Sequence, residues 1–201
     1  MGVKYVVNTL RRTASRTKDD DMEEIRIMVD HEAFLIGIKP ALCRRMIPQL
    51  EKLMPQLGKY PHMIDADGSY LFFQNQELMD NYLASMANVE WGSAKHHRIL
   101  GLTLGYPPEA VTFYLARRDN EALYQYCVNV GYAGYRFVAH VNDLHHIIVH
   151  MWDKYEVKEE ARIGVGSELL YTGFRDYEKL KEVVGEVRNK LSDQLNVTKS
   201  S

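Results

Sequence analysis

The stretch HHRILGLTLGYPPEAVTFYLARR, residues 96–118, decides how we interpret the rest of this chain. Apolar residues recur in it at helical spacing, namely Leu100, Leu104, Val111 and Leu115. Gly105-Tyr106-Pro107-Pro108 interrupts the pattern. Glycine readily takes the positive φ that ends a helix, and proline fits the first turn of the next helix. The stretch therefore predicts a helix, a tight turn and a second helix.

Helix-turn-helix units also occur in DNA-binding regulators, so one alternative is a regulator that reads duplex DNA through residues 96–118. The second helix would offer four side chains to the major groove: Glu109, Thr112, Phe113 and Ala116. None of them is the Arg, Asn or Gln that usually reads a base edge. A structural helical hairpin is therefore the favoured interpretation.

The turn itself resembles a motif of a known family. Leu104-Gly105-Tyr106-Pro107-Pro108 is similar to the LGYPPCC-like motif of an uncharacterised prokaryotic family, in which cysteines stand at the positions of Glu109 and Ala110. The resemblance implies no function, and the two replaced cysteines count against a cysteine-based role.

The composition excludes several classes of protein. A net charge of −2 gives no overall attraction to nucleic acid or to an anionic membrane. No apolar run is long enough to span a membrane, and the first residues show no signal-peptide pattern. Cys43 and Cys127 are far apart in the sequence and are expected to be reduced thiols. We therefore expect a cytoplasmic protein.

The remaining patterns predict a helix-rich α+β fold in a single globular domain, residues 1–196. It should contain two or three short antiparallel β-hairpins and a C-terminal helix. Asp65-Ala66-Asp67-Gly68 and Gly166-Ser167 are turn signals between β-prone segments. Apolar spacing predicts a closing helix from Tyr177 to about Leu195.

Other segments are less distinctive. Ala41–Leu53 is expected to be a helix bent at Pro48, and Glu121–Val130 a further helix. Residues 8–21 are expected to form an exposed charged loop and residues 197–201 a disordered tail. Residues 31–47 and 97–115 share an order of residue types, and whether they are a true internal repeat stays open, with coincidence favoured.

A cluster of histidines gives the sharpest chemical hypothesis. It consists of His140, His145, His146 and His150. On a helix, His146 and His150 stand one turn apart and Asp153 follows one turn later, a spacing that suits a divalent metal such as zinc or manganese. His97 is a further candidate ligand. On a strand the same histidines would lie too far apart, and the sequence leaves helix or strand open for 144–152. A metal-dependent hydrolase is therefore an alternative function.

No set of nucleophile, base and oxyanion donors stands out in the sequence. The leading hypothesis is therefore a binding or regulatory protein without catalysis and without a cofactor, acting through a Tyr- and His-rich surface at about 131–153. The expected binding residues are Tyr132, Tyr135, Arg136, His140 and His145. Its partner should be another protein or a small phosphorylated ligand. Nucleic acid is open but not favoured, a membrane is not expected, and the oligomeric state is open.

Overall fold

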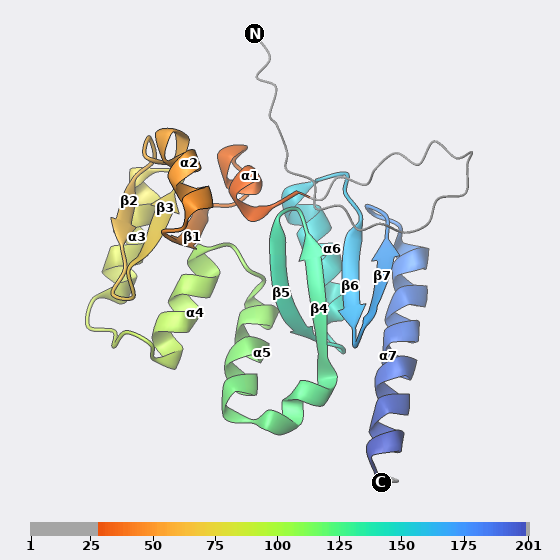
Figure 1. Ribbon diagram of the computed structural model, residues 1–201. Helices are drawn as coiled ribbons and strands as arrows, with labels where there is room; N and C mark the ends of the chain where they lie inside the picture. Colours follow the sequence, from red (N-terminus) through yellow and green to blue (C-terminus); the bar gives the residue numbers. More distant parts are fainter. Residues whose placement is uncertain (1–27, 200–201) are drawn as a thin grey trace.

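A computed structural model describes residues 28–199, which form a single α+β domain with two small antiparallel sheets (Figure 1). This confirms the predicted fold class. Sheet A has the strand order β1-β3-β2, and sheet B the order β5-β4-β6-β7. The strands are β1 Ala41–Arg45, β2 His62–Ile64, β3 Ser69–Phe73, β4 Cys127–Tyr132, β5 Tyr135–His140, β6 Ala161–Val165 and β7 Glu168–Thr172. The helices are α1 Asp30–Leu35, α2 Pro48–Leu57, α3 Gln76–Met86, α4 Ala94–Thr103, α5 Pro108–Asp119, α6 Leu144–Tyr155 and α7 Tyr177–Lys199, with a 3-10 helix, η1, at Glu121–Tyr126.

Sheet A has apolar side chains on both faces, because successive side chains of a strand point to opposite sides. In β3, Phe72 packs with residues of α1 and α2, including Phe34 and Leu50. Its neighbours Leu71 and Phe73 belong instead to a second cluster with α3 and α4. Sheet A is therefore covered by helices on both sides.

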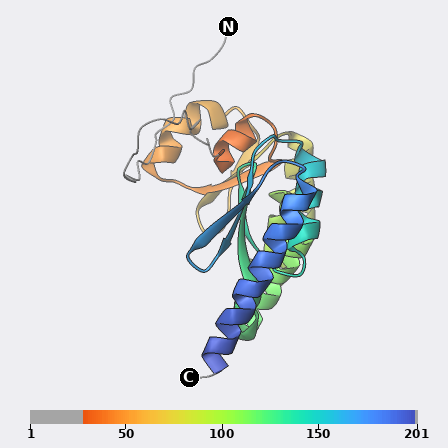
Figure 2. The same ribbon diagram turned by 90° about the vertical axis from the view of Figure 1, so that its right-hand side faces the viewer.

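Sheet B has its main core on one face only. The β4 residues Val128, Val130 and Tyr132 are buried in a large apolar cluster with α6 and α7. These two helices contribute Leu144, Ile147, Ile148, Met151, Trp152, Leu180, Val183, Val184, Val187 and Leu191. Figure 2 shows α7 lying along the sheet. The alternate residues of the same strands point to the other face, where α4 and α5 lie.

The predicted helix–turn–helix unit is confirmed as α4 and α5. Gly105 ends α4 with a φ of 87°, and Pro108 is the first residue of α5. A Cβ atom at position 105 would lie 2.5 Å from the hydroxyl oxygen of Tyr135. Tyr135 donates a hydrogen bond of 2.8 Å to the Tyr155 hydroxyl, which donates one of 2.9 Å to the carbonyl of Gly105. The turn is thereby attached to β5 and to α6.

The structure corrects two predicted helices. Ala41–Leu53 is not one bent helix: residues 41–45 form strand β1, and Pro48 begins α2. Proline suits the first helical position because its missing N–H has no partner there, while β1 finds a partner in β3. Glu121–Val130 is likewise a 3-10 helix followed by strand β4, because the segment from Cys127 pairs with β5.

The two predicted hairpins around 65–68 and 166–167 are confirmed. Residues 31–47 fold as a helix and a strand, whereas 97–115 fold as two helices, so the structure does not support an internal duplication. The expected loop at 8–21 lies outside the described residues. The C-terminal helix continues to Lys199, so the tail expected from 197 is helical up to that residue.

Candidate ligand-binding site

A pocket of about 660 Å³ lies between the α4–α5 pair and the free face of sheet B. This volume falls within the range of roughly 300–1,000 Å³ that is typical of small-molecule sites. Its walls are mainly apolar and include Leu100, Leu104, Val111, Val138 and Leu169. Its polar lining residues include Asn129, Arg136 and Arg162.

The floor of the pocket follows from the strand register of sheet B. Residues paired across neighbouring strands share one face and form rows. The first row is Arg136, Gly131, Arg162 and Tyr171. The second row is Val138, Asn129, Gly164 and Leu169. Gly131 and Gly164 lie on the two central strands and carry no side chain, so main chain faces the pocket at these two positions, beside Asn129 and Arg162.

Arg136 and Arg162 face one another across Gly131. Neighbouring strands are about 4.8 Å apart, so the Cα atoms of the two arginines are roughly 10 Å apart, a gap that two long side chains span. A Cβ atom at position 131 would lie 3.3 Å from Nη2 of Arg162. The guanidinium of Arg162 therefore lies over Gly131, and Arg136 stands on the other side of Gly131 in the same row.

The charge at this point is not balanced by the described residues. Arg162 has a side chain that is 14% exposed, and its Nη2 lies 3.7 Å from the carboxylate of Glu159. Burial lowers the pKa of Arg162, and the charge of Arg136 lowers it further. The buried Nε of Arg162 has no hydrogen-bond partner within residues 28–199. Arg136 has no described carboxylate within 4.0 Å. Glu159 is thus the one described carboxylate within 4.0 Å of either guanidinium group.

The roof of the pocket consists of α4 and α5, which approach each other closely at Gly101. A Cβ atom there would lie 2.9 Å from a methyl carbon of Val111. Below this contact, Leu100 and Leu104 from α4 and Tyr114 from α5 line the pocket. The two helices thus contribute mainly apolar residues to the roof, together with His97 on α4 and Arg117 on α5.

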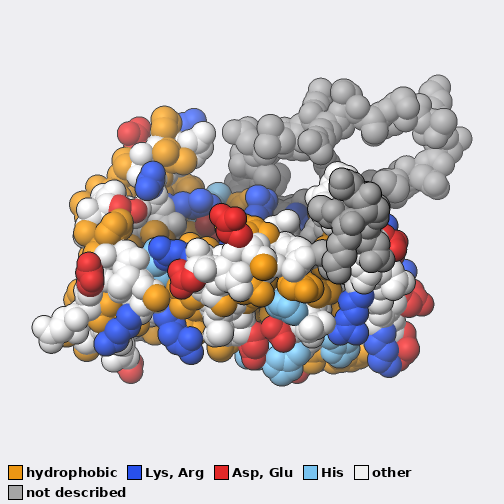
Figure 3. Space-filling model, turned by 90° about the horizontal axis from the view of Figure 1, so that it is seen from below, with side chains coloured by type: hydrophobic (Ala, Val, Ile, Leu, Met, Phe, Trp, Pro, Cys, Tyr) orange, Lys and Arg blue, Asp and Glu red, His pale blue; other side chains and the backbone are white. Residues whose placement is uncertain are grey.

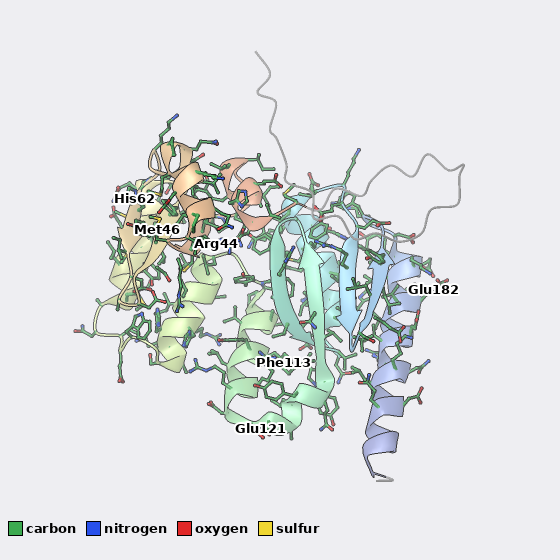
Figure 4. All side chains as sticks on the ribbon, viewed as in Figure 1. Arg44, Met46, His62, Phe113, Glu121 and Glu182 are labelled. Carbon is green, nitrogen blue, oxygen red and sulfur yellow. The ribbon has the colours of Figure 1, made fainter. Side chains whose placement is uncertain are left out.

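A second, smaller cavity of about 280 Å³ shares Tyr106 and Arg136 with the pocket. It is also lined by Asp30 and by Arg44, which form an ion pair. Arg44 is labelled in Figure 4. Close by, the amine of Lys39 lies 5.1 Å from the ring centre of Tyr106. Burial lowers the pKa of Lys39 to about 8. The end of the pocket at Tyr106 and Arg136 thus lies next to the junction between sheets A and B.

The structure separates the predicted binding residues. Tyr132 and Tyr135 are 0% exposed, so they do not form the exposed tyrosine surface that we expected. Tyr132 donates a hydrogen bond of 2.6 Å to the carbonyl of Val157. His140 is partly buried and contacts the ring of Phe113, and His145 is partly buried on α6. Of this group, only Arg136 lines the pocket.

The structure also shows where the residues proposed for a metal site lie. The segment 144–152 lies in helix α6, which answers the question that the sequence left open. His146 lies 3.4 Å from the carboxylate of Glu109, and Asp153 lies 3.6 Å from Arg175. Histidine side chains are visible on the underside of the molecule, with acidic and basic groups nearby (Figure 3).

His97 lies on α4, in the pocket lining, and its ring contacts Tyr114; His150 is partly buried on α6. Within residues 28–199, no group of three or more His, Cys, Asp or Glu side chains is arranged to hold a metal ion. The metal-dependent hydrolase therefore gains no geometric support from the described residues.

The DNA-binding alternative depends on an accessible α5. In the structure α5 packs against β5, and Ala110, Val111 and Phe113 are buried. Phe113, labelled in Figure 4, contacts the ring of His140 with a centroid distance of 5.2 Å. The helix that would read DNA is thus largely occupied with the packing of this domain.

Comparison with protein-family models, with curated proteins and with solved structures finds no match to this chain. Within residues 28–199, no helix is long and apolar enough to cross a membrane. The function therefore has to be argued from the geometry of the pocket.

Our sequence analysis missed Gly131 and Arg162. A signal was present: Asn129-Val130-Gly131-Tyr132 and Arg162-Ile163-Gly164-Val165 both alternate between an apolar residue and a polar or small one. Such alternation predicts a strand with one face in the core and one face free. It does not say which strands are neighbours, and the row of two arginines exists only in the paired sheet.

Proposed function

We propose that this protein binds a small amphipathic anion in the pocket between α4, α5 and sheet B. A carboxylate or phosphate group lies beside the guanidinium of Arg162, which covers Gly131, on the side of Arg136. The apolar body of the ligand lies under the two helices. The observation that carries the proposal is the cross-strand row Arg136–Gly131–Arg162 on the free face of the sheet.

The chemistry of the two arginines supports an anion. A guanidinium group has five N–H donors in a planar fork that matches a carboxylate or a phosphate. Arg162 retains an unpartnered buried Nε among the described residues, and Glu159 neutralises only part of the local charge. An anion beside the Arg162 guanidinium would accept these hydrogen bonds and balance the charge.

The walls support an apolar body. Leucine and valine side chains of both helices and of the strand floor border most of the remaining space. Burying apolar ligand surface against such walls contributes roughly 25 cal/mol per Å². The pocket therefore favours a molecule with one charged end and a hydrocarbon or ring body over a fully polar metabolite.

The role that we propose is binding rather than catalysis, which keeps the leading hypothesis of the sequence analysis. It shifts the binding region from an exposed tyrosine and histidine surface to a pocket, with Arg136 common to both. The lining residues include donors and apolar groups, but they do not include an activated nucleophile with a partnered base. The ligand class agrees with the expected small phosphorylated ligand and adds carboxylates to it.

The test is isothermal titration calorimetry with decanoate, decyl phosphate and the neutral analogue decanol. We expect at least one of the two anions to bind more tightly than decanol. Arg162→Gln should weaken binding of that anion by about tenfold or more, because a hydrogen bond to a charged group contributes about 1.5–3 kcal/mol. Comparison of decanoate with decyl phosphate shows which anionic group the site prefers.

The matched control is Arg188→Gln, which removes the same charge from an exposed position on α7. It should leave the affinity unchanged. Equal affinity for decanol and for both anions, or equal losses in the two variants, would show that the arginine row does not recognise an anion.

A further inference from the structure

A third arginine lines the same pocket and lies at its opposite end. Arg117 projects from α5, and its Nη1 lies 3.7 Å from Sγ of Cys127. Cys127 is the first residue of β4, whereas Gly131 is four residues further along the same strand. At about 3.3 Å per residue, the two ends of this part of the floor are roughly 13 Å apart.

Arg117 is held in place by aromatic rings and not by a carboxylate. Its guanidinium carbon lies 4.8 Å from the ring centre of Tyr124 and 5.9 Å from that of Tyr114. Its buried Nε has no hydrogen-bond partner within residues 28–199, and no described carboxylate lies within 4.0 Å of it. A buried donor without a partner costs about 1–3 kcal/mol, so an acceptor group at this point would be stabilised.

The space between the two charged ends is apolar. Leu100 and Val111 border it from the roof, and Val138 borders it from the floor. Asn129 is the polar exception in the middle of β4. The pocket thus has the pattern of positive charge, apolar middle and positive charge along the direction of β4.

We propose that the ligand is an elongated dianion, with one acidic group beside the Arg162 guanidinium, on the side of Arg136, and the second acidic group at Arg117. This inference rests on the proposed function and specifies its ligand class. Decanedioate, an extended diacid with a length close to the separation of the two ends, is the probe. The ligand class is that of long-chain dicarboxylates and their phosphate-bearing analogues.

The experiment compares decanedioate, its monomethyl ester and decanoate on the same protein by calorimetry. We expect decanedioate to bind the wild type about tenfold or more tightly than decanoate, because the second carboxylate adds a hydrogen bond to a charged donor. The monomethyl ester should bind like decanoate, since it has lost one charge. Hexanedioate, which is too short to reach both ends, should bind less tightly than decanedioate.

Arg117→Gln should remove the advantage of decanedioate and leave the affinity for decanoate within about twofold, a difference of less than 0.5 kcal/mol. Arg118→Gln is the matched control, because Arg118 is the neighbouring residue on α5 and is exposed. The monomethyl ester keeps the test decisive even if Arg117→Gln does not fold, because it needs no variant.

The two proposals fail in different ways. If decanoate binds through Arg162 and decanedioate binds no better, the dianion is excluded and the single-anion site stands. An equal loss for both ligands in Arg117→Gln would likewise assign Arg117 a structural role. If none of the anions binds better than decanol, the proposed function itself is wrong.

Discussion

Sheets A and B are both small and antiparallel, but their second faces differ. In sheet A, the alternate side chains Leu71 and Phe72 are both fully buried, because helices cover each side. In sheet B, the core face is equally buried, whereas Asn129, on the other face of the central strand β4, is exposed. The central strands of sheet B carry Gly131 and Gly164 where sheet A carries large apolar residues.

The difference in how their second faces are covered gives the two sheets different roles. A sheet that is filled on both faces is a structural element, because no space remains for another molecule. A sheet with one filled face and one hollow face keeps its stability from the first and offers the second to a ligand. We therefore assign stability to sheet A and to the helix-covered face of sheet B, and binding to the other face.

The largest expected effect concerns the filled sheet. Phe72→Ala should lower the free energy of unfolding by about 3–5 kcal/mol, since it leaves a cavity among fully buried residues. Leu169→Ala, on the open face of sheet B, should cost less than about 0.5 kcal/mol. Urea unfolding followed by circular dichroism measures both values. Similar losses in the two variants would mean that the open face is packed in solution and that the contrast between the sheets is wrong.

The next effect concerns Lys39 at the junction between the sheets. Its pKa is about 8 in the folded protein and 10.5 in the unfolded chain. Between these values the unfolded chain binds more protons, so stability rises with pH across this window. The difference in the free energy of unfolding between wild type and Lys39→Met should therefore change by up to about 3 kcal/mol from pH 8 to pH 10.5.

Comparison with Lys39→Met cancels the contribution of buried tyrosines remote from Lys39, such as Tyr132, whose surroundings the substitution leaves unchanged. The pKa of Tyr132 is raised by burial, which lowers stability at high pH in wild type and variant alike. If the free energies of unfolding of the two proteins changed in parallel with pH, the pKa of Lys39 would not be lowered in the folded protein. Water would then surround its amine at the junction.

The last prediction concerns Gly131 in the floor of the pocket. We expect its substitution to have a small effect on stability and a clear effect on binding. Gly131→Ala places a Cβ atom 3.3 Å from Nη2 of Arg162, so the guanidinium that binds the anion has to shift. We expect affinity for the preferred anion to fall by about three- to tenfold, or 0.6–1.4 kcal/mol. The free energy of unfolding should change by less than about 1 kcal/mol.

Gly185→Ala on α7 serves as the control, because its Cβ atom would meet nothing within 4 Å. It should raise stability by about 0.5–1 kcal/mol without changing affinity. A Gly131→Ala protein that binds as well as wild type would place the anion away from the centre of the row.

The elements that were predicted correctly are those with strong local signals. Gly105 with Pro107 and Pro108 defined the helical pair, and Asp67-Gly68 and Gly166-Ser167 defined two hairpins. The failures were strands β1 and β4, whose residues also fit a helix when taken alone. Their strand conformation depends on pairing with β3 and with β5 and β6, which lie elsewhere in the sequence.

The candidate site was harder to predict than the fold for the same reason. Arg136 was identified because it lies near the histidine cluster, but Arg117 and Arg162 come from a helix and a strand that are remote in sequence. Only the register brings Arg136, Gly131 and Arg162 into one row. The tyrosines that drew attention in the sequence, Tyr132 and Tyr135, proved to be core residues.

Helices α4 and α5, which come from the most distinctive stretch of the sequence, also connect the cores of the two sheets. Leu100 and Leu104 of α4 pack against the core of sheet A, whereas Ala110 of α5 belongs to the core of sheet B. The turn at Gly105 connects these helices and is hydrogen-bonded to Tyr155. Loss of either core would therefore remove the support of the other, and the protein is expected to unfold in one cooperative transition despite having separate apolar clusters.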